Sequence, residues 1–152
     1  MIIGIDPGLA NTGFGIIDDA DGIRCVRYGV ITTPPDALPQ IRVRTIFREI
    51  NGILNTHKPD ELSIERLFFS RNVSSAIEVS HARGVVLLAA AEYGIDVFEY
   101  TPNQIKQAVT GSGRADKKQM QKMVGVLLGI DEKMPADAAD ALAAAICHAH
   151  IR

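Results

Sequence analysis

The chain opens on Met1-Ile2-Ile3-Gly4-Ile5-Asp6, an apolar and β-branched run that ends on a carboxylate and is followed by Pro7-Gly8. Its length and composition predict a buried strand over Ile2–Asp6, which Pro7-Gly8 terminates. An ionised carboxylate among apolar neighbours is costly unless it is paired or binds a metal ion. Asp6 is therefore the first candidate for a functional residue.

The same pattern recurs in Leu62-Ser63-Ile64-Glu65, for which we predict a strand over Glu61–Glu65. Because each carboxylate ends its strand, Asp6 and Glu65 converge at one end of the sheet if the two strands are neighbours. The third occurrence is Pro135-Ala136-Asp137-Ala138-Ala139-Asp140-Ala141-Leu142, at the start of a helix predicted over Ala136–His148.

Two carboxylates of this helix, Asp137 and Asp140, are three residues apart, so they lie on one helical face. The alanines around them let the helix approach the sheet closely, within reach of Asp6 and Glu65. Four carboxylates carry a charge that matches two divalent cations. Hard oxygen ligands with no cysteine or histidine cluster nearby suit Mg²⁺ or Mn²⁺, and two such ions suit in-line displacement at a phosphate ester.

Each of these acids also has an ordinary explanation. An aspartate after a strand commonly belongs to a turn, Asp137 near a helix start favours the helix dipole, and Glu65 beside Arg66 can form a surface ion pair. Taken one residue at a time, these explanations are the more common ones. Together they leave unexplained why every acid sits at the end of an apolar element. Serine-type chemistry is a weaker alternative, because no serine has histidine and acid partners at a recognisable spacing.

The rest of the pattern predicts further strands and helices. Strands are expected over Gly13–Ile17, Val26–Thr32 and Ile95–Tyr100, and helices over Ile41–Leu54, Ser74–Tyr93, a short segment opened by Thr101-Pro102, and Asp116–Leu128. Three hairpin-linked strands followed by alternating strands and helices predict an α/β fold with a five-stranded mixed sheet flanked by helices. For 152 residues we expect one domain, 1–152.

The composition, 47% hydrophobic and 22% charged, is ordinary for a soluble globular protein. We find no apolar run of membrane-spanning length and no secretory signal. Cys25 and Cys147 are isolated in apolar contexts, which predicts reduced thiols in a cytosolic protein. His148 lies more than two turns beyond the Asp137/Asp140 pair, so it is not expected to be a ligand of the same site. We expect His148 and His150 to fray into solvent.

A net charge of −2 does not by itself indicate a nucleic-acid binder, but the distribution of charge does not exclude one. A solvated helix face is the usual explanation for any single lysine. The bases nevertheless gather in two groups: Lys106, Arg114, Lys117, Lys118 and Lys122 against the single acid Asp116, and Arg66, Arg71 and Arg83.

Several motifs, in this order and spacing, resemble those of the RuvC family of bacterial Holliday junction resolvases, endonucleases with an RNase H-like fold. They are Gly4-Ile5-Asp6-Pro7-Gly8, Ile64-Glu65-Arg66-Leu67-Phe68-Phe69, His81-Ala82-Arg83-Gly84, Glu99-Tyr100-Thr101-Pro102, Ile105-Lys106-Gln107 and Ala136-Asp137-Ala138-Ala139-Asp140-Ala141-Leu142-Ala143. The resemblance runs from Met1 to His148, nearly the whole chain.

The resemblance implies roles for the matching residues. The catalytic, metal-binding acids are Asp6, Glu65, Asp137 and Asp140, with two Mg²⁺ ions per site. Phe68 matches an aromatic residue that stacks on a base near the junction centre, although it could also be a core phenylalanine. Lys106 and Lys117 match lysines near the scissile backbone, and candidates for further DNA contacts are Lys118, Arg71, Arg83 and Arg114.

The resemblance also implies a homodimer that nicks a four-way junction symmetrically, with the branch-migration proteins RuvA and RuvB as partners and no membrane association. Three alternatives remain open. The opening Gly4–Gly13 also resembles the phosphate-binding segment of actin-like ATPases, although those proteins need two such domains. An RNase H-like nuclease that processes RNA, and a DNA-binding module with vestigial acids, are the other two.

Overall fold

The structure is a computed structural model that describes residues 1–67 and 73–152. Its strands are β1 (Ile2–Asp6), β2 (Asn11–Asp18), β3 (Arg24–Thr32), β4 (Glu61–Glu65) and β5 (Asp96–Tyr100). Its helices are α1 (Pro39–His57), α2 (Val73–Tyr93), α3 (Pro102–Thr110), α4 (Lys117–Leu128) and α5 (Ala136–Ile151). The order of elements is the predicted one, and predicted and observed ends differ by less than one helical turn.

The strands form one five-stranded sheet in the order β3-β2-β1-β4-β5. β1, β2 and β3 pair antiparallel, whereas β4 is parallel to β1 and β5 is parallel to β4. The predicted mixed sheet is therefore confirmed. Ile5 lies opposite Ile64 in the register of β1 and β4, so the carboxyl ends of these two strands adjoin, as the hypothesis of a shared site requires.

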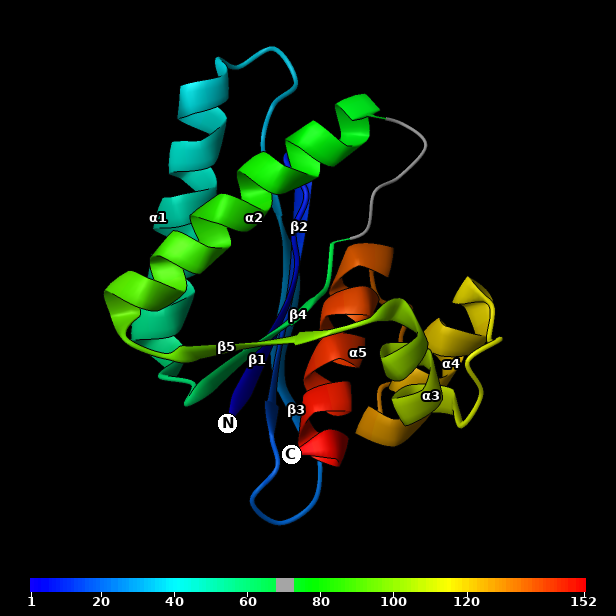
Figure 1. Cartoon of the computed structure of the whole chain (residues 1–152). Helices are drawn as coiled ribbons and strands as arrows, with labels where there is room; N and C mark the ends of the chain where they lie inside the picture. The colour runs from blue at the N-terminus through cyan, green and yellow to red at the C-terminus, as the bar shows by residue number, and fades with distance from the viewer. Residues whose placement is uncertain (68–72) are drawn as a thin grey trace.

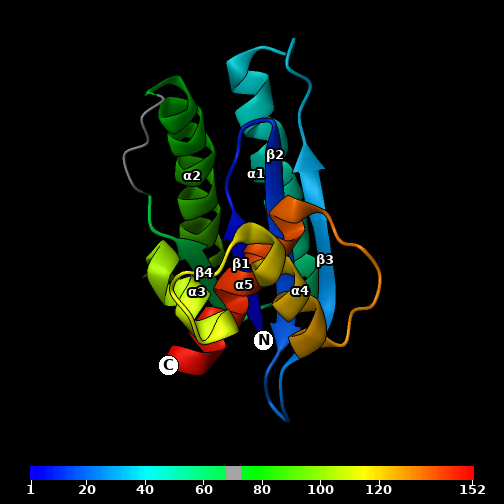
Figure 2. The ribbon, with the colours of Figure 1, turned by 90° about the vertical axis from the view of Figure 1, so that its right-hand side faces the viewer.

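Helices cover both faces of the sheet (Figure 1, Figure 2). α1 and α2 cover one face, over a core cluster that includes Ile3 and Ile5 of β1. α5 lies on the other face, where Ile2 belongs to a second cluster, and α3 and α4 pack outside it. The alternation of side chains along β1 thus divides the core in two and turns Asp6 toward α5.

α5 lies directly against the sheet because glycines face it. A Cβ atom added to Gly4 would lie 1.9 Å from the carbonyl oxygen of Ala141, and one added to Gly13 would lie 1.9 Å from that of Asp137. Ser63 of β4 donates a hydrogen bond of 2.7 Å to the carbonyl of Ala144, which fixes the helix to a third strand. No side chain larger than hydrogen fits at either glycine without moving α5.

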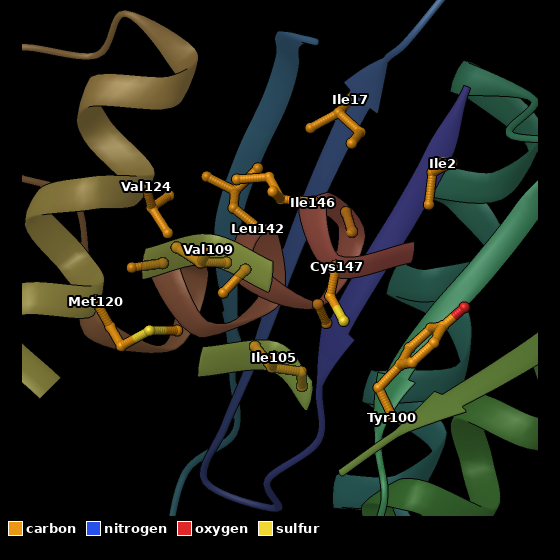
Figure 3. Packing of buried hydrophobic residues seen from close by; sticks show 14 of the residues in the cluster. Ile2, Ile17, Tyr100, Ile105, Val109, Met120, Val124, Leu142, Ile146 and Cys147 are labelled. Carbon is orange, nitrogen blue, oxygen red and sulfur yellow. The ribbon is translucent and has the colours of Figure 1, made fainter. Parts of the chain in front are cut away.

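The cluster around α5 forms the core on this face of the sheet. Figure 3 shows Leu142 and Ile146 of α5 beside Ile17 of β2, with residues of α3 and α4 on the far side of the helix. Two capping boxes, at Thr101 and Asp116, fix the starts of α3 and α4. Both short helices pack against α5, and the caps fix where they begin.

The prediction that His148 frays into solvent is wrong. Its side chain is 1% exposed, stacks on Phe98 at 4.3 Å, and is hydrogen-bonded through Nδ1 to the Tyr100 hydroxyl at 2.6 Å. The reason is tertiary: Arg152, just beyond α5, bonds Asp19 and Glu61 and holds the last turn in place. His150, in contrast, is exposed as predicted.

α2 also departs from expectation. By length and composition alone it is apolar enough to cross a membrane, whereas we predicted that no run would be. One side of α2 packs on α1 and the sheet through Ala82, Val86 and Ala89. Both cysteines are free, as predicted, with Cys147 buried and Cys25 half-buried.

Candidate metal centre

The structure gathers three of the four predicted carboxylates at the carboxyl end of β1. Asp6, Asp137 and Asp140 each offer one carboxylate oxygen, and these oxygens all lie within 4.8 Å of one another. Asp6 ends β1, whereas Asp137 and Asp140 lie on one face of the first turns of α5. Residues more than 130 positions apart in sequence are thus brought within the ligand spacing of a single ion.

Glu65, the fourth predicted acid, lies at the end of β4 and lines the same cavity of about 550 Å³ as the three aspartates. It is more exposed than they are and is not among the three whose oxygens meet within 4.8 Å. Its charge nevertheless acts on the cluster, because it contributes to the raised pKa of Asp6. The four acids therefore form one electrostatic unit, with three close together and one at the side.

Glycine is the reason that Asp137 reaches Asp6, and sequence reasoning missed it. Gly13 of β2 pairs with Asp6 in the sheet and faces the backbone of Asp137. A larger residue there would push the start of α5 away from the carboxyl end of β1. The signal in the sequence was a glycine inside a predicted strand, as at Gly4. Such a glycine indicates that another segment approaches the strand closely, but it does not identify that segment.

Burial and mutual repulsion make the cluster costly to ionise. Burial, followed by the charges of Asp140, Asp137 and Glu65, raises the pKa of Asp6 from 3.8 to about 8. Burial also raises the pKa of Glu65 and of Asp140, although nearby lysines oppose the rise in both. Carboxylates that repel one another resist ionisation when no cation is present. A bound divalent cation would offset this repulsion, so raised pKa values are expected at an empty cation site.

Two predicted lysines lie with the acids. Lys106 of α3 and Lys117 of α4 line the same cavity, and Lys117 Nζ lies 3.4 Å from Asp140 Oδ2. The Asp140 carboxylate raises the pKa of Lys117, so the ammonium stays charged. Lys117 is the first residue of α4, directly after the cap residue Asp116. The capping box therefore fixes the position of the Lys117 backbone beside the acids.

The chemistry of the donors fits a hard divalent cation. Every group within the cluster is a carboxylate, with no thiol or imidazole among the described residues that line the cavity. Oxygen-only sites with several carboxylates suit Mg²⁺ and Mn²⁺ better than Zn²⁺ or copper. The acids that line the cavity outnumber its two lysines, Lys106 and Lys117, and a bound cation would offset the repulsion among the carboxylates.

The remaining predicted DNA contacts are scattered around this site. Lys118 lines a separate cavity of about 630 Å³ with Lys122 and Lys133. Arg114 lines the surface between α3 and α4, where its amide donates to Ser112 Oγ. Arg83 points inward and is 9% exposed. Phe68 and Arg71 lie outside the described residues.

Comparison with known proteins gives a consistent result. A family model described as crossover junction endodeoxyribonuclease RuvC matches residues 2–148. The proteins of that name from Alkaliphilus oremlandii and Heliobacterium modesticaldum are 51% and 49% identical to the chain, covering 99% of it and 93% and 94% of their own lengths.

Solved structures agree with these sequence matches. The structure of Thermus thermophilus RuvC in complex with a Holliday junction substrate superposes with a TM-score of 0.92 at 37% identity, over 98% of this chain and 92% of that one. The yeast mitochondrial Holliday junction resolvase shares the fold, with a TM-score of 0.71 at 14% identity, over 98% of this chain and 77% of that one.

Proposed function

Since the chain belongs to the RuvC family of crossover junction endodeoxyribonucleases, we propose that Asp6, Glu65, Asp137 and Asp140 bind two Mg²⁺ ions and form its catalytic site. The protein is a Holliday junction resolvase with the RNase H-like fold, an endonuclease of DNA recombination and repair. Membership of this family gives no support to the two alternatives of an actin-like ATPase and of a DNA-binding module with vestigial acids. The single observation that carries the site assignment is the meeting of three carboxylates from β1 and α5 in one cavity.

The residues of the site divide the work. The acids would hold the cations, which would supply an activated water and stabilise the leaving oxygen. Asp140 is held in place by Lys117 at 3.4 Å. Lys106 and Lys117, which line the same cavity, balance the charge of the phosphodiester as it enters. No side-chain nucleophile is needed.

Further DNA contacts extend outward from this cavity. Lys118 and Arg114 lie on α4 and on the segment before it, where they can follow the phosphate backbone beyond the scissile bond. Phe68 is proposed to stack on a base near the junction centre, and Arg71 to contact phosphate, on the basis of the family pattern alone. Base stacking on an aromatic ring contributes about 1–3 kcal/mol.

The test of this function is a substrate comparison in one assay. A four-way DNA junction, a linear duplex of the same sequence and an RNA stem are incubated with the protein and Mg²⁺. We expect paired nicks in the junction and little or no cleavage of the other two. Preferential cleavage of the RNA stem would favour the RNA-processing alternative instead, and cleavage in EDTA would exclude the metal assignment.

We propose a homodimer that uses the outer face of α2. Ile77 and Leu88 are each 51% exposed, Val73 is 69% exposed, and these three residues share one helical face with Gly84, around which space is open. Exposed apolar side chains gathered on one helical face mark a candidate interaction surface. A second copy fits a substrate with two-fold symmetry, because two sites would then face two strands of like polarity.

Leu88→Glu is expected to convert the dimer into a monomer, because the two-fold axis would bring like charges together at a cost of several kcal/mol. Light scattering should report a mass of 16.4 kDa in place of twice that value. The matched control is Val126→Glu, which places the same charge on α4 at a residue that is 66% exposed. A Leu88→Glu protein that remains dimeric at micromolar concentration would move the interface away from α2.

RuvA and RuvB are the proposed partners in branch migration, and the bacterial cytoplasm is the proposed compartment. Both proposals rest on membership of the family and on relatives from bacteria.

A further inference from the structure

Arg83 of α2 is the most buried of the lysines, arginines and carboxylates that the structure describes. Its Nη1 donates a hydrogen bond of 2.6 Å to the backbone carbonyl oxygen of Glu65, and its Nη2 lies 3.0 Å from Glu99 Oε1. Both ends of the guanidinium therefore have partners inside the protein. A buried and doubly bonded arginine is poorly placed for the phosphate contact that the sequence predicted.

The carbonyl of Glu65 needs such a donor because of the strand beside it. The backbone groups of successive residues point to opposite neighbours, and the amide of Arg66 donates to Tyr100 of β5, so the carbonyl of Glu65 faces β1. The register pairs Ile5 with Ile64, and one residue further it brings Pro7 to the position that would donate to this carbonyl. Proline has no N–H, so the ladder cannot satisfy the carbonyl.

Glu99 completes the arrangement from the other neighbouring strand. It lies on β5 opposite Ile64, one residue before the position beside Glu65, and its side chain turns to the face that α2 covers. The guanidinium therefore connects β4, β5 and α2 at the point where β4 ends. The carboxylate of Glu65 projects from the other face of the sheet, into the cavity with Asp6.

We infer that Arg83 is a positioning residue for Glu65: its guanidinium fixes the end of β4, and through the backbone it fixes the direction of the Glu65 carboxylate toward the acidic cluster. The inference rests on the proposed metal-binding role of Glu65. It assigns to Arg83 a function in the metal site from behind the sheet, without contact with DNA. Arginine suits this role because its rigid fork reaches two acceptors at once.

The test measures metal binding without catalysis. Binding of Mn²⁺ to the protein without DNA is measured by calorimetry, junction affinity is measured in EDTA, and exchange of the Arg66 amide is followed by NMR. Arg83→Ala is expected to weaken Mn²⁺ binding by about 10–100-fold, the usual effect of removing a group that orients a ligand. Its Arg66 amide should exchange faster, because the end of β4 is released, while junction affinity stays within about twofold.

Two further variants make the result specific. Arg66→Ala is the matched control, since Arg66 is exposed and lies 3.9 Å from the same Glu99 but does not bond the Glu65 carbonyl. It should leave Mn²⁺ affinity unchanged. Arg83→Lys preserves the charge if Arg83→Ala does not fold, and it is expected to weaken Mn²⁺ binding several-fold, because one ammonium cannot reproduce the fork.

The outcomes separate this inference from the proposed function. Weaker junction binding by Arg83→Ala with unchanged Mn²⁺ affinity and unchanged amide exchange would make Arg83 a phosphate contact and overturn the inference. Unchanged Mn²⁺ affinity and amide exchange in Arg83→Lys would do the same. If the wild-type protein bound no Mn²⁺, the proposed metal site as a whole would be wrong. If the wild type binds Mn²⁺ and the Arg83 variants bind it equally well, the inference about Arg83 alone is wrong.

Discussion

An Asp6→Asn protein is expected to bind four-way junction DNA and to lose Mg²⁺-dependent cleavage by at least about 10²–10³-fold, the loss that follows removal of one preorganised electrostatic contact. Asp6 is the central member of the cluster, because its pKa responds to Asp140, Asp137 and Glu65 together. Asparagine has nearly the same shape but carries no charge, so the variant removes a proposed metal ligand and leaves the packing of β1 against α5 in place.

The measurement compares single-turnover cleavage with junction binding in the absence of metal. Asp116→Asn is the matched control: Asp116 lines the same cavity, but its carboxylate caps α4 by accepting from the Gln119 amide at 2.8 Å. Asparagine is an equally good cap, so this variant should cleave at nearly the wild-type rate. Normal cleavage by Asp6→Asn would show that Asp6 does not bind the catalytic metal.

Local pattern was enough to predict where most elements lie. The apolar runs that end at Asp6 and Glu65 determined β1 and β4 to the residue, and Thr101-Pro102 correctly marked the start of α3. These signals are contained within a few neighbouring residues, which is why they can be recognised without the fold. The convergence of the acids could also be anticipated, because parallel neighbouring strands end at the same edge of a sheet.

What could not be predicted depends on contacts between distant segments. His148 is buried because Phe98 and Tyr100 of β5 cover it, and no local pattern links these positions. Arg83 looked like one of several surface arginines, since an arginine that bonds Glu65 from behind the sheet has the same neighbours in sequence as one that faces solvent. Burial of a charged residue is decided by its partners, and partners are a property of the tertiary structure.

The electrostatics of the cluster lead to an expectation about stability. Without divalent metal, the free energy of unfolding is expected to fall as pH rises from about 4 to about 8. Asp6 has a pKa of about 8 in the folded protein against 3.8 for an ordinary aspartate, so between these values the folded state holds a proton that the unfolded state has released. Stability falls with pH wherever the folded state binds more protons.

The limits of this window follow from the same pKa values. Below pH 4 the carboxyl of Asp6 is protonated in both states and costs nothing, whereas above pH 8 it is ionised in both and the full cost of four neighbouring acids is present. The raised pKa values of Glu65 and Asp140 act in the same direction. Since one pKa unit corresponds to about 1.4 kcal/mol, we expect a loss of a few kcal/mol across the window.

Urea denaturation in EDTA at pH 5 and pH 8 measures this loss. Asp6→Asn should have a much smaller pH dependence and should be more stable than the wild type at pH 8, because it removes one of the mutually repelling carboxylates. Mn²⁺ should stabilise the wild type at pH 8 by an amount that rises with the logarithm of its concentration above the Kd, and should stabilise Asp6→Asn far less. An equal pH dependence in the two proteins would mean that Asp6 ionises freely, and that the carboxylates do not repel one another strongly enough to require a cation between them.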